Sequence, residues 1–300
     1  MKKLEAYFLM ESSMNVYKFV ELISDTTNVY ILFEINYGDL HSYMKEKKRL
    51  NESEARLLFQ QCAQAVDDCH QNGIIVRDIK LKKFVFTDSK KTKLALANLE
   101  DCIILDDDAQ TDMIKSQQGC PAYVSPEVLN PQQDLYSGRL SDSWSLGVIL
   151  YTLLIGRYPF HDQTIPKTFA KITRGKFQIP PSSGLSLDAR TLIRSLIRYT
   201  PEERLLPNEI LATNWFKQSS TVSPFSSSDH INLSQAVNFI NSLTSNTQAI
   251  TTNTNQLIQR KPLEAALSAP LSTHTTNINS NSSNIRSQLN INERNLPGEC

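Results

Sequence analysis

The stretch VRDIKLKK, at residues 76–83, is the part of this chain that decides its fold. Upstream of it, apolar residues recur at helical spacing over residues 53–69, which predicts an amphipathic helix. Downstream, FVF at residues 84–86 and LALANL at residues 94–99 predict two short strands. The charged stretch therefore forms a loop between a long helix and a pair of strands.

Three further motifs follow this loop in order. They are GCPAYVSPE at residues 119–127, DSWSLGV at residues 142–148 and TPEERLLPNEIL at residues 200–211. The loop resembles the catalytic loop of protein kinases, and the three motifs resemble the end of the activation segment, the start of the long central helix and the segment after it that carries a pairing Arg. The ordered set predicts an α+β, protein-kinase-like fold, with a mostly helical C-lobe and a remnant of the N-lobe sheet.

Three residues of these motifs are expected to be structural. Asp142 should hold the backbone of the catalytic loop, and Glu127 should form a buried ion pair with Arg204. Such buried pairs fix an architecture more than they add net stability.

The loop itself keeps only part of a kinase's chemistry. Asp78 and Lys80 occupy the catalytic positions, where an Asp orients the acceptor hydroxyl and a Lys steadies a phosphate, and we expect both to be vestigial. Lys83 stands where kinases place a magnesium-binding Asn, and Asn98-Leu99-Glu100 stands where they place Asp-Phe-Gly. Magnesium needs carboxylate oxygens. The sequence therefore predicts a degraded metal site at Lys83, Asn98 and Glu100, with no metal and no cofactor except for weak, metal-independent ATP binding.

The chain divides into three predicted regions. Residues 1–36 should be a partial N-lobe with the end of one helix and two strands, and residues 37–218 the C-lobe. Residues 219–300 are rich in Ser, Thr and Asn and should be largely disordered, since they offer little apolar surface to bury. The expected elements are a hairpin of residues 17–22 and 28–33 and helices at residues 142–156, 165–175, 187–197 and 207–216. No glycine-rich phosphate loop and no V-A-I-K strand precede the hairpin.

Bulk properties limit the classes of partner. The net charge is zero, so no overall field attracts nucleic acid or anionic lipid. The five cysteines show no zinc spacing and are typical of a reducing compartment. No apolar run approaches the roughly 20 residues that span a bilayer, and the N-terminus lacks a signal-peptide core. We expect no nucleic acid or membrane partner and a cytoplasmic or nuclear location, or both.

Five stretches together resemble one family, the Tribbles pseudokinases. They are FEINYGDLHSYMKEKKRL, VRDIKLKKFVF, GCPAYVSPE, YSGRLSDSWSLGVILYTLLIGRYPFHD and LIRSLIRYTPEERLLPNEIL, with NLE in place of the usual Asp-Phe-Gly. The resemblance covers about residues 15–216 and implies an adaptor with a truncated N-lobe.

The resemblance also implies partners. These are MAP kinase kinases, an E3 ubiquitin ligase and a transcription-factor substrate of that ligase. The motif for kinase kinases is similar to residues 210–216, which gives Ile210, Leu211, Trp215 and Phe216 as partner-binding residues, although Thr213-Asn214 replaces the family's His-Pro. The ligase motif D-Q-x-V-P is not matched. Residues 228–231, SDHI, begin similarly and continue as Asn-Leu.

Two other interpretations remain open. The chain could be a weak or metal-independent serine/threonine kinase that uses Asp78, or an incomplete lobe that folds poorly and has no role of its own. The sequence favours the adaptor, because the metal site is degraded.

Overall fold

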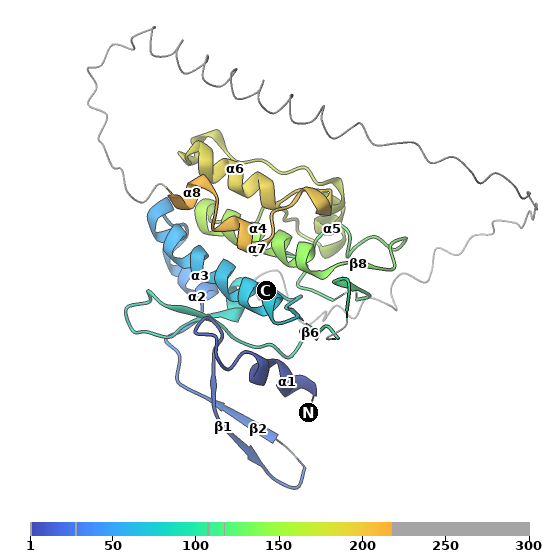
Figure 1. Cartoon of the computed structure of the whole chain (residues 1–300). Coiled ribbons are helices and arrows are strands. Elements are labelled where there is room, and N and C mark those ends of the chain that lie inside the picture. Colours follow the sequence, from blue (N-terminus) through green and yellow to red (C-terminus); the bar gives the residue numbers. More distant parts are fainter. Residues whose placement is uncertain (1, 28, 107–108, 117, 218–300) are drawn as a thin grey trace, which may run out of the picture. The chain divides into compact units, whose positions relative to one another are not determined.

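The protein is described by a computed structural model that covers residues 2–27, 29–106, 109–116 and 118–217 (Figure 1). These residues belong to one compact unit. The predicted mixture of helices and short strands is confirmed. The tail, with its predicted disorder and its ligase-like SDHI stretch, lies outside the described residues.

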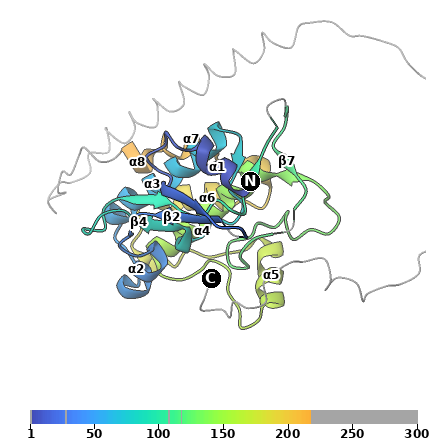
Figure 2. The same ribbon diagram turned by 90° about the horizontal axis from the view of Figure 1, so that it is seen from below.

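The N-terminal part consists of α1 (Lys2–Leu9) and the hairpin of β1 (Phe19–Ser24) and β2 (Val29–Phe33). The predicted hairpin is confirmed: the strands are antiparallel and Leu22 lies opposite Ile31. Its inner face packs on α1 through aromatic rings, with the ring centres of Tyr7 and Phe33 5.6 Å apart. Figure 2 shows the hairpin from below, in front of the helices of the C-lobe.

Helices dominate the rest of the described chain. They are α2 (Leu40–Lys47), α3 (Glu52–Gln71), α4 (Gly138–Ile155), α5 (Ile165–Arg174), α6 (Leu187–Leu196), α7 (Pro207–Ile210) and α8 (Asn214–Lys217). Short 3-10 turns occur at Leu81–Lys83, Pro181–Ser183 and Pro201–Glu203. The helices predicted around residues 53–69, 142–156, 165–175 and 187–197 are confirmed, with small shifts at their ends.

Helix α4 forms the centre of this lobe, because nearly every side chain from Ser141 to Leu154 is buried. It packs against α3 and α6. The approach to α6 is so close that a Cβ at Gly147 would lie 2.7 Å from the Cβ of Leu196. The helix ends at Gly156, whose φ of 81° is the left-handed conformation that favours glycine.

Helix α3 brings the chain to the loop at residues 76–83. Asn51 caps it by accepting a hydrogen bond of 2.9 Å from the backbone N–H of Glu54. Its buried face carries Ala55, Phe59, Cys62 and Val66 at helical spacing, as the sequence predicts. The loop therefore starts from a rigid support.

Three antiparallel pairs of short strands follow the hairpin, and the first two flank the loop. They are β3 (Ile74–Ile75) paired with β6 (Ile103–Ile104), β4 (Phe84–Phe86) paired with β5 (Leu94–Leu96), and β7 (Met113–Ile114) paired with β8 (Tyr136–Ser137). The pair β4–β5 was predicted, and the two-residue strands were too short to be recognised in the sequence. The segment around Val16 adds to β5 through a parallel bridge to Leu96.

The helix predicted over residues 207–216 is wrong as a single helix, because the chain forms α7 and α8 with a turn between them. The reason lies at Thr213, whose N–H and hydroxyl both donate to the carbonyl of Ile210, at 3.1 and 2.8 Å. A short polar side chain that bonds locally in this way competes with the helical ladder.

Within the part of the chain described here, no helix has both the length and the apolar character needed to cross a membrane.

Candidate functional site

Asp142 fixes the backbone of the catalytic loop. This residue is fully buried in the first two turns of α4. Its carboxylate accepts hydrogen bonds from the backbone N–H groups of Val76, at 2.9 Å, and Arg77, at 2.8 Å. The Nε2 atom of His70 lies 2.8 Å from the same carboxylate. These contacts hold Arg77 in a left-handed conformation, with φ of 66°. The structure thus places Asp142 where the sequence predicts it, on the backbone of the loop.

Asp78 lies between two lysines. Its Oδ2 atom is 2.7 Å from Nζ of Lys80 and 3.9 Å from Nζ of Lys83. The side chain of Asp78 keeps 16% of its surface exposed, whereas that of Lys83 keeps 4%. The carboxylate is therefore engaged by two cations in place of a metal ion.

Lys83 is the unusual member of this group. Burial lowers the pKa of its amine, although the carboxylates of Asp78 and Asp101 act in the opposite direction. Its Nζ atom makes no hydrogen bond with any described residue. A buried ammonium of this kind repels a divalent cation.

Asn98 and Glu100 do not join this group. Asn98 is exposed and left-handed, with φ of 59°, and its Oδ1 atom accepts a hydrogen bond of 3.2 Å from the N–H of Glu100. The side-chain oxygen is thus used within its own turn, and the side chain of Glu100 is exposed. Of the three residues of the predicted degraded metal site, Lys83 is the one that the described structure places within ion-pair distance of Asp78.

Leu99, between Asn98 and Glu100 in the sequence, is fully buried. Its N–H donates a hydrogen bond of 3.0 Å to the hydroxyl of Tyr7 on α1. Burial raises the pKa of Tyr7, which keeps the phenol protonated. Sequence reasoning missed Tyr7, because nothing in the local pattern of α1 indicates a contact with residue 99.

The side-chain oxygens of Asp78 and Asn98 do not fit a magnesium ion. Magnesium prefers near-octahedral oxygen coordination with carboxylates. The carboxylate of Asp78 is paired with lysines, and the oxygen of Asn98 is occupied. Among the residues that the structure describes, no cluster of three or more His, Cys, Asp or Glu side chains could hold a metal ion.

The structure brings Glu127 and Arg204 together. The two guanidinium nitrogens Nη1 and Nη2 donate to the carboxylate at 2.6 and 2.7 Å. Arg204 also donates to three backbone carbonyls, those of Leu140, Arg198 and Tyr199. All five N–H donors of a guanidinium are thus satisfied in the core.

The predicted partner-binding residues divide into two pairs. Ile210 and Trp215 have 0% exposed surface, so direct contact of a partner with either is incompatible with this arrangement. Leu211 and Phe216 are half-buried and reach the surface. Partner binding by this motif stays a prediction, and the structure limits direct contact to Leu211 and Phe216, because α7 and α8 each turn one of the other two side chains into the core.

Trp215 is fixed by residues that the sequence did not reveal. Its Nε1 atom donates a hydrogen bond of 2.9 Å to Oε2 of Glu52. The guanidinium of Arg56 lies 5.1 Å from the centre of the Trp215 ring. Glu52 also accepts from the N–H and hydroxyl of Ser186, at 2.6 and 2.8 Å. Burial alone would raise the pKa of Glu52, but these hydrogen bonds lower it below its ordinary value.

Comparison with known proteins agrees with this geometry. The family model described as "Protein kinase domain" matches residues 5–216. Tribbles homolog 2 of Canis lupus familiaris is 48% identical over 218 residues, and Tribbles homolog 1 of Homo sapiens is 48% identical over 215 residues. Tribbles homolog 3 of Bos taurus is 42% identical over 234 residues. These alignments cover 72%, 72% and 78% of this chain.

A kinase-like helical lobe with an altered catalytic loop defines the class of this protein. Within that class, the chain belongs to the Tribbles family of pseudokinases. The chain spans 62%, 56% and 64% of the length of these three relatives.

Proposed function

We propose that this chain is a catalytically impaired adaptor, which binds MAP kinase kinases and also brings an E3 ubiquitin ligase to a transcription-factor substrate. In this way it would modulate kinase signalling and protein degradation. The observation that supports the proposal is the buried ammonium of Lys83, which lies 3.9 Å from Asp78 at the position where kinases place a magnesium-binding Asn.

This arrangement removes the two things that phosphoryl transfer requires of the loop. Transfer depends on magnesium to neutralise the phosphates and on an Asp that is free to accept the proton of the substrate hydroxyl. Here the buried ammonium of Lys83 lies 3.9 Å from Asp78, where it opposes a divalent cation and engages the carboxylate. A binding role is the use that such a lobe retains.

The surface proposed for a kinase kinase is the end of the lobe formed by the half-buried Leu211 and Phe216. Trp215 acts from below, because its ring packs against Phe216 with ring centres 5.0 Å apart. The buried Trp215 then positions the exposed edge of the motif without touching the partner.

A pull-down with a purified MAP kinase kinase tests this surface. The double variant Leu211→Ala/Phe216→Ala should lose at least about tenfold in affinity, because burying the still exposed parts of two apolar side chains is worth about 1.5 kcal/mol or more. Leu135→Ala is the matched control, since Leu135 is also partly exposed, at 48%, and lies in another segment. Equal binding by both variants would remove this motif from the proposal.

The ligase part of the proposal concerns the tail. It rests on the similarity of residues 228–231 to the start of the family motif. Co-precipitation of the ligase with the full chain, and its loss in Asp229→Ala/Ile231→Ala, tests it. We also propose that the chain resides in the cytoplasm, the nucleus or both.

A second candidate function is weak or metal-independent serine/threonine kinase activity. It is favoured by the exposure of Asp78, which keeps 16% of its side-chain surface accessible in a firmly held loop. Incubation with labelled ATP, with magnesium or with a chelator, distinguishes the two functions. Phosphate incorporation that Asp78→Asn abolishes would establish the kinase and overturn the adaptor proposal.

A further inference from the structure

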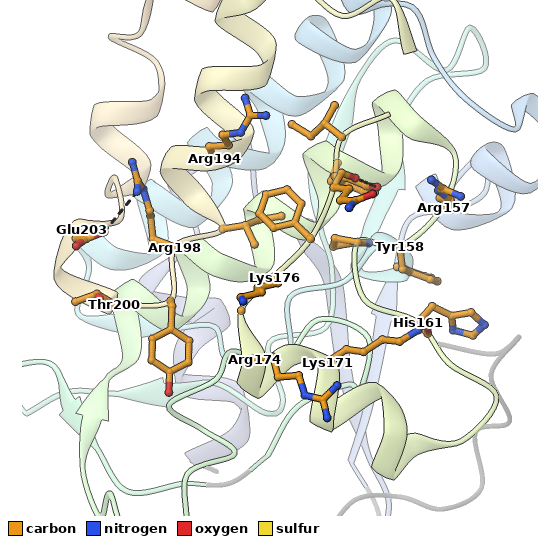
Figure 3. A pocket seen from close by; sticks show the side chains of 18 of the residues that line it. Arg157, Tyr158, His161, Lys171, Arg174, Lys176, Arg194, Arg198, Thr200 and Glu203 are labelled. Carbon is orange, nitrogen blue, oxygen red and sulfur yellow. Dashed lines mark hydrogen bonds and ion pairs between the residues drawn. The ribbon is translucent and has the colours of Figure 1, made fainter. Parts of the chain in front are cut away.

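A recess of about 1590 Å³ lies among α4, α5 and α6, and none of residues 76–100 lines it (Figure 3). Six cationic side chains line it, and together they are called the basic hollow here: Arg157, Lys171, Arg174, Lys176, Arg194 and Arg198. They come from the segment after α4, from α5 and the segment after it, and from α6 and the turn that follows. Glu203 is the only carboxylate of the described chain among the lining residues.

The charge of the basic hollow is unusual for this protein. The whole chain carries equal numbers of acidic and basic residues, whereas this recess has an excess of five positive charges. Lys171 is 3.1 Å from Asp162, and Arg198 is 3.6 Å from Glu203. The other four cations, two of them on helices α5 and α6, form no ion pair with any described residue and are exposed. Like charges gathered in a concave site attract an anion.

The floor of the recess is apolar and aromatic. Tyr151 and Ile197 are buried there, and the rings of Tyr151 and Phe177 meet edge to face with centres 5.9 Å apart. Tyr199 stands at the edge with 59% of its surface exposed. The recess thus offers both cations for an anionic group and apolar surface for a neighbouring side chain.

We propose that the basic hollow binds a segment of a partner protein that carries phosphorylated serine or threonine. Four of its six cations are arginines, whose planar guanidinium matches a phosphate with two parallel hydrogen bonds. Arginine clusters are a recurrent means of phosphopeptide recognition. The recess is also larger than the roughly 300–1,000 Å³ of most small-molecule sites, as a peptide requires.

Other occupants fit less well. The tail at residues 218–300 carries four acidic and four basic residues, so it lacks the required charge. A lipid surface is flat, whereas these cations line a recess. The proposal does not depend on the MAP kinase kinase surface, which lies on Leu211 and Phe216.

The proposal is tested by passing a peptide library over the immobilised full chain. Each peptide of the library carries one phosphoserine or phosphothreonine at a fixed position, and the residues on either side are randomised. Its unphosphorylated twin, a single-stranded oligouridine and phosphatidylserine vesicles are the comparison probes. We expect the phosphorylated library to be retained about tenfold more than its twin. The double variant Arg174→Gln/Arg194→Gln should lose this preference.

The matched control is Lys45→Gln/Lys90→Gln, which removes the same charge from exposed positions outside the basic hollow. It should retain the library as the unmodified chain does. If the arginine double variant melts below this control, Lys176→Gln, which lies in a loop, replaces it. Equal retention of the two libraries, equal loss in the control, or tighter binding of the RNA or the vesicles would overturn the proposal.

Discussion

The side chain of Lys83 places a buried ammonium 3.9 Å from Asp78, in a loop that already contains Lys80. Burial lowers the pKa of this amine, although the carboxylates of Asp78 and Asp101 act in the opposite direction, so the folded protein disfavours the charged form. An isolated ion pair in the interior is often no more stable than an apolar side chain of similar size. Lys83 is therefore the residue of this loop at which a substitution is most informative.

Replacement of this lysine by methionine should stabilise the fold. At pH 7 we expect Lys83→Met to raise the free energy of unfolding by about 1 kcal/mol, because the buried charge is removed. The folded-state pKa lies below the ordinary value of 10.5, so the unfolded chain binds more protons and the wild type gains stability as the pH rises toward 10.5. The difference in melting temperature should therefore narrow between pH 7 and pH 10.

Lys80→Met is the control, since Lys80 is more exposed, with 22% of its side chain accessible, and makes the shorter contact with Asp78. It should leave the melting temperature unchanged or lower it. A Lys83→Met protein that is less stable than wild type at pH 7 would show that attraction to Asp78 outweighs burial.

Tyr7 gives a second test at this scale. Tyr7→Phe removes the hydroxyl that accepts from Leu99, and a buried N–H without an acceptor costs about 1–3 kcal/mol. Urea denaturation should show this loss, whereas Tyr37→Phe, at an exposed tyrosine, should show none. Equal midpoints for the two variants would mean that water replaces the hydroxyl.

At the scale of the element, α8 is only four residues long and depends on its contacts for stability. Glu52, at the start of α3, holds it through Trp215 and also holds Ser186 at the start of α6. One carboxylate therefore joins three helices at the end of the lobe that we propose for partner binding.

Loss of this carboxylate should loosen all three helices. We expect Glu52→Gln to lower the free energy of unfolding at pH 7 by about 1–2 kcal/mol, as for hydrogen bonds to a charged group. The pKa of Glu52 is lowered from its ordinary value of 4.5, so its contribution is present above that pH and is lost as the pH falls through the folded-state pKa. Denaturation at pH 7 and pH 4 should show the gap between wild type and variant narrowing in acid.

Glu46→Gln is the control, because Glu46 is exposed on α2. A gap for Glu52→Gln that stayed constant with pH would assign the effect to packing and not to the charge.

Across the whole lobe, the pair of Glu127 and Arg204 connects segments that are far apart in sequence. The guanidinium joins the end of the activation-segment motif, the carbonyl of Leu140 in α4 and the turn after α6, and it lies 5.0 Å from the ring centre of Trp144. The charges are shielded from water, since the side chains are 4% and 0% exposed.

Removal of one partner should therefore affect the entire fold. Arg204→Leu leaves the buried carboxylate of Glu127 unpaired, and we expect it to lower the free energy of unfolding by about 3–5 kcal/mol. The double variant Glu127→Leu/Arg204→Leu should recover part of that loss in chemical denaturation. No recovery in the double variant would show that the backbone contacts of Arg204, and not its pairing, support the lobe.

The sequence by itself determined α3, α4, α5 and α6, the β1–β2 hairpin and the residues of the altered catalytic loop. Periodicity reports which face of a helix is buried, and the replacements at residues 83 and 98 are chemical facts that need no coordinates. It therefore predicted the fold class, the family and the loss of metal ligands.

Only the tertiary structure decided which side chains face one another across the lobe. It buried Ile210 and Trp215, paired Tyr7 with Leu99, engaged the side-chain oxygen of Asn98 within its own turn and gathered the six cations of the basic hollow. A local pattern contains no information on which distant segment will cover a side chain, because that depends on the packing of helices that are separated along the chain by tens of residues. These contacts and this recess therefore became visible only when the helices were placed in space.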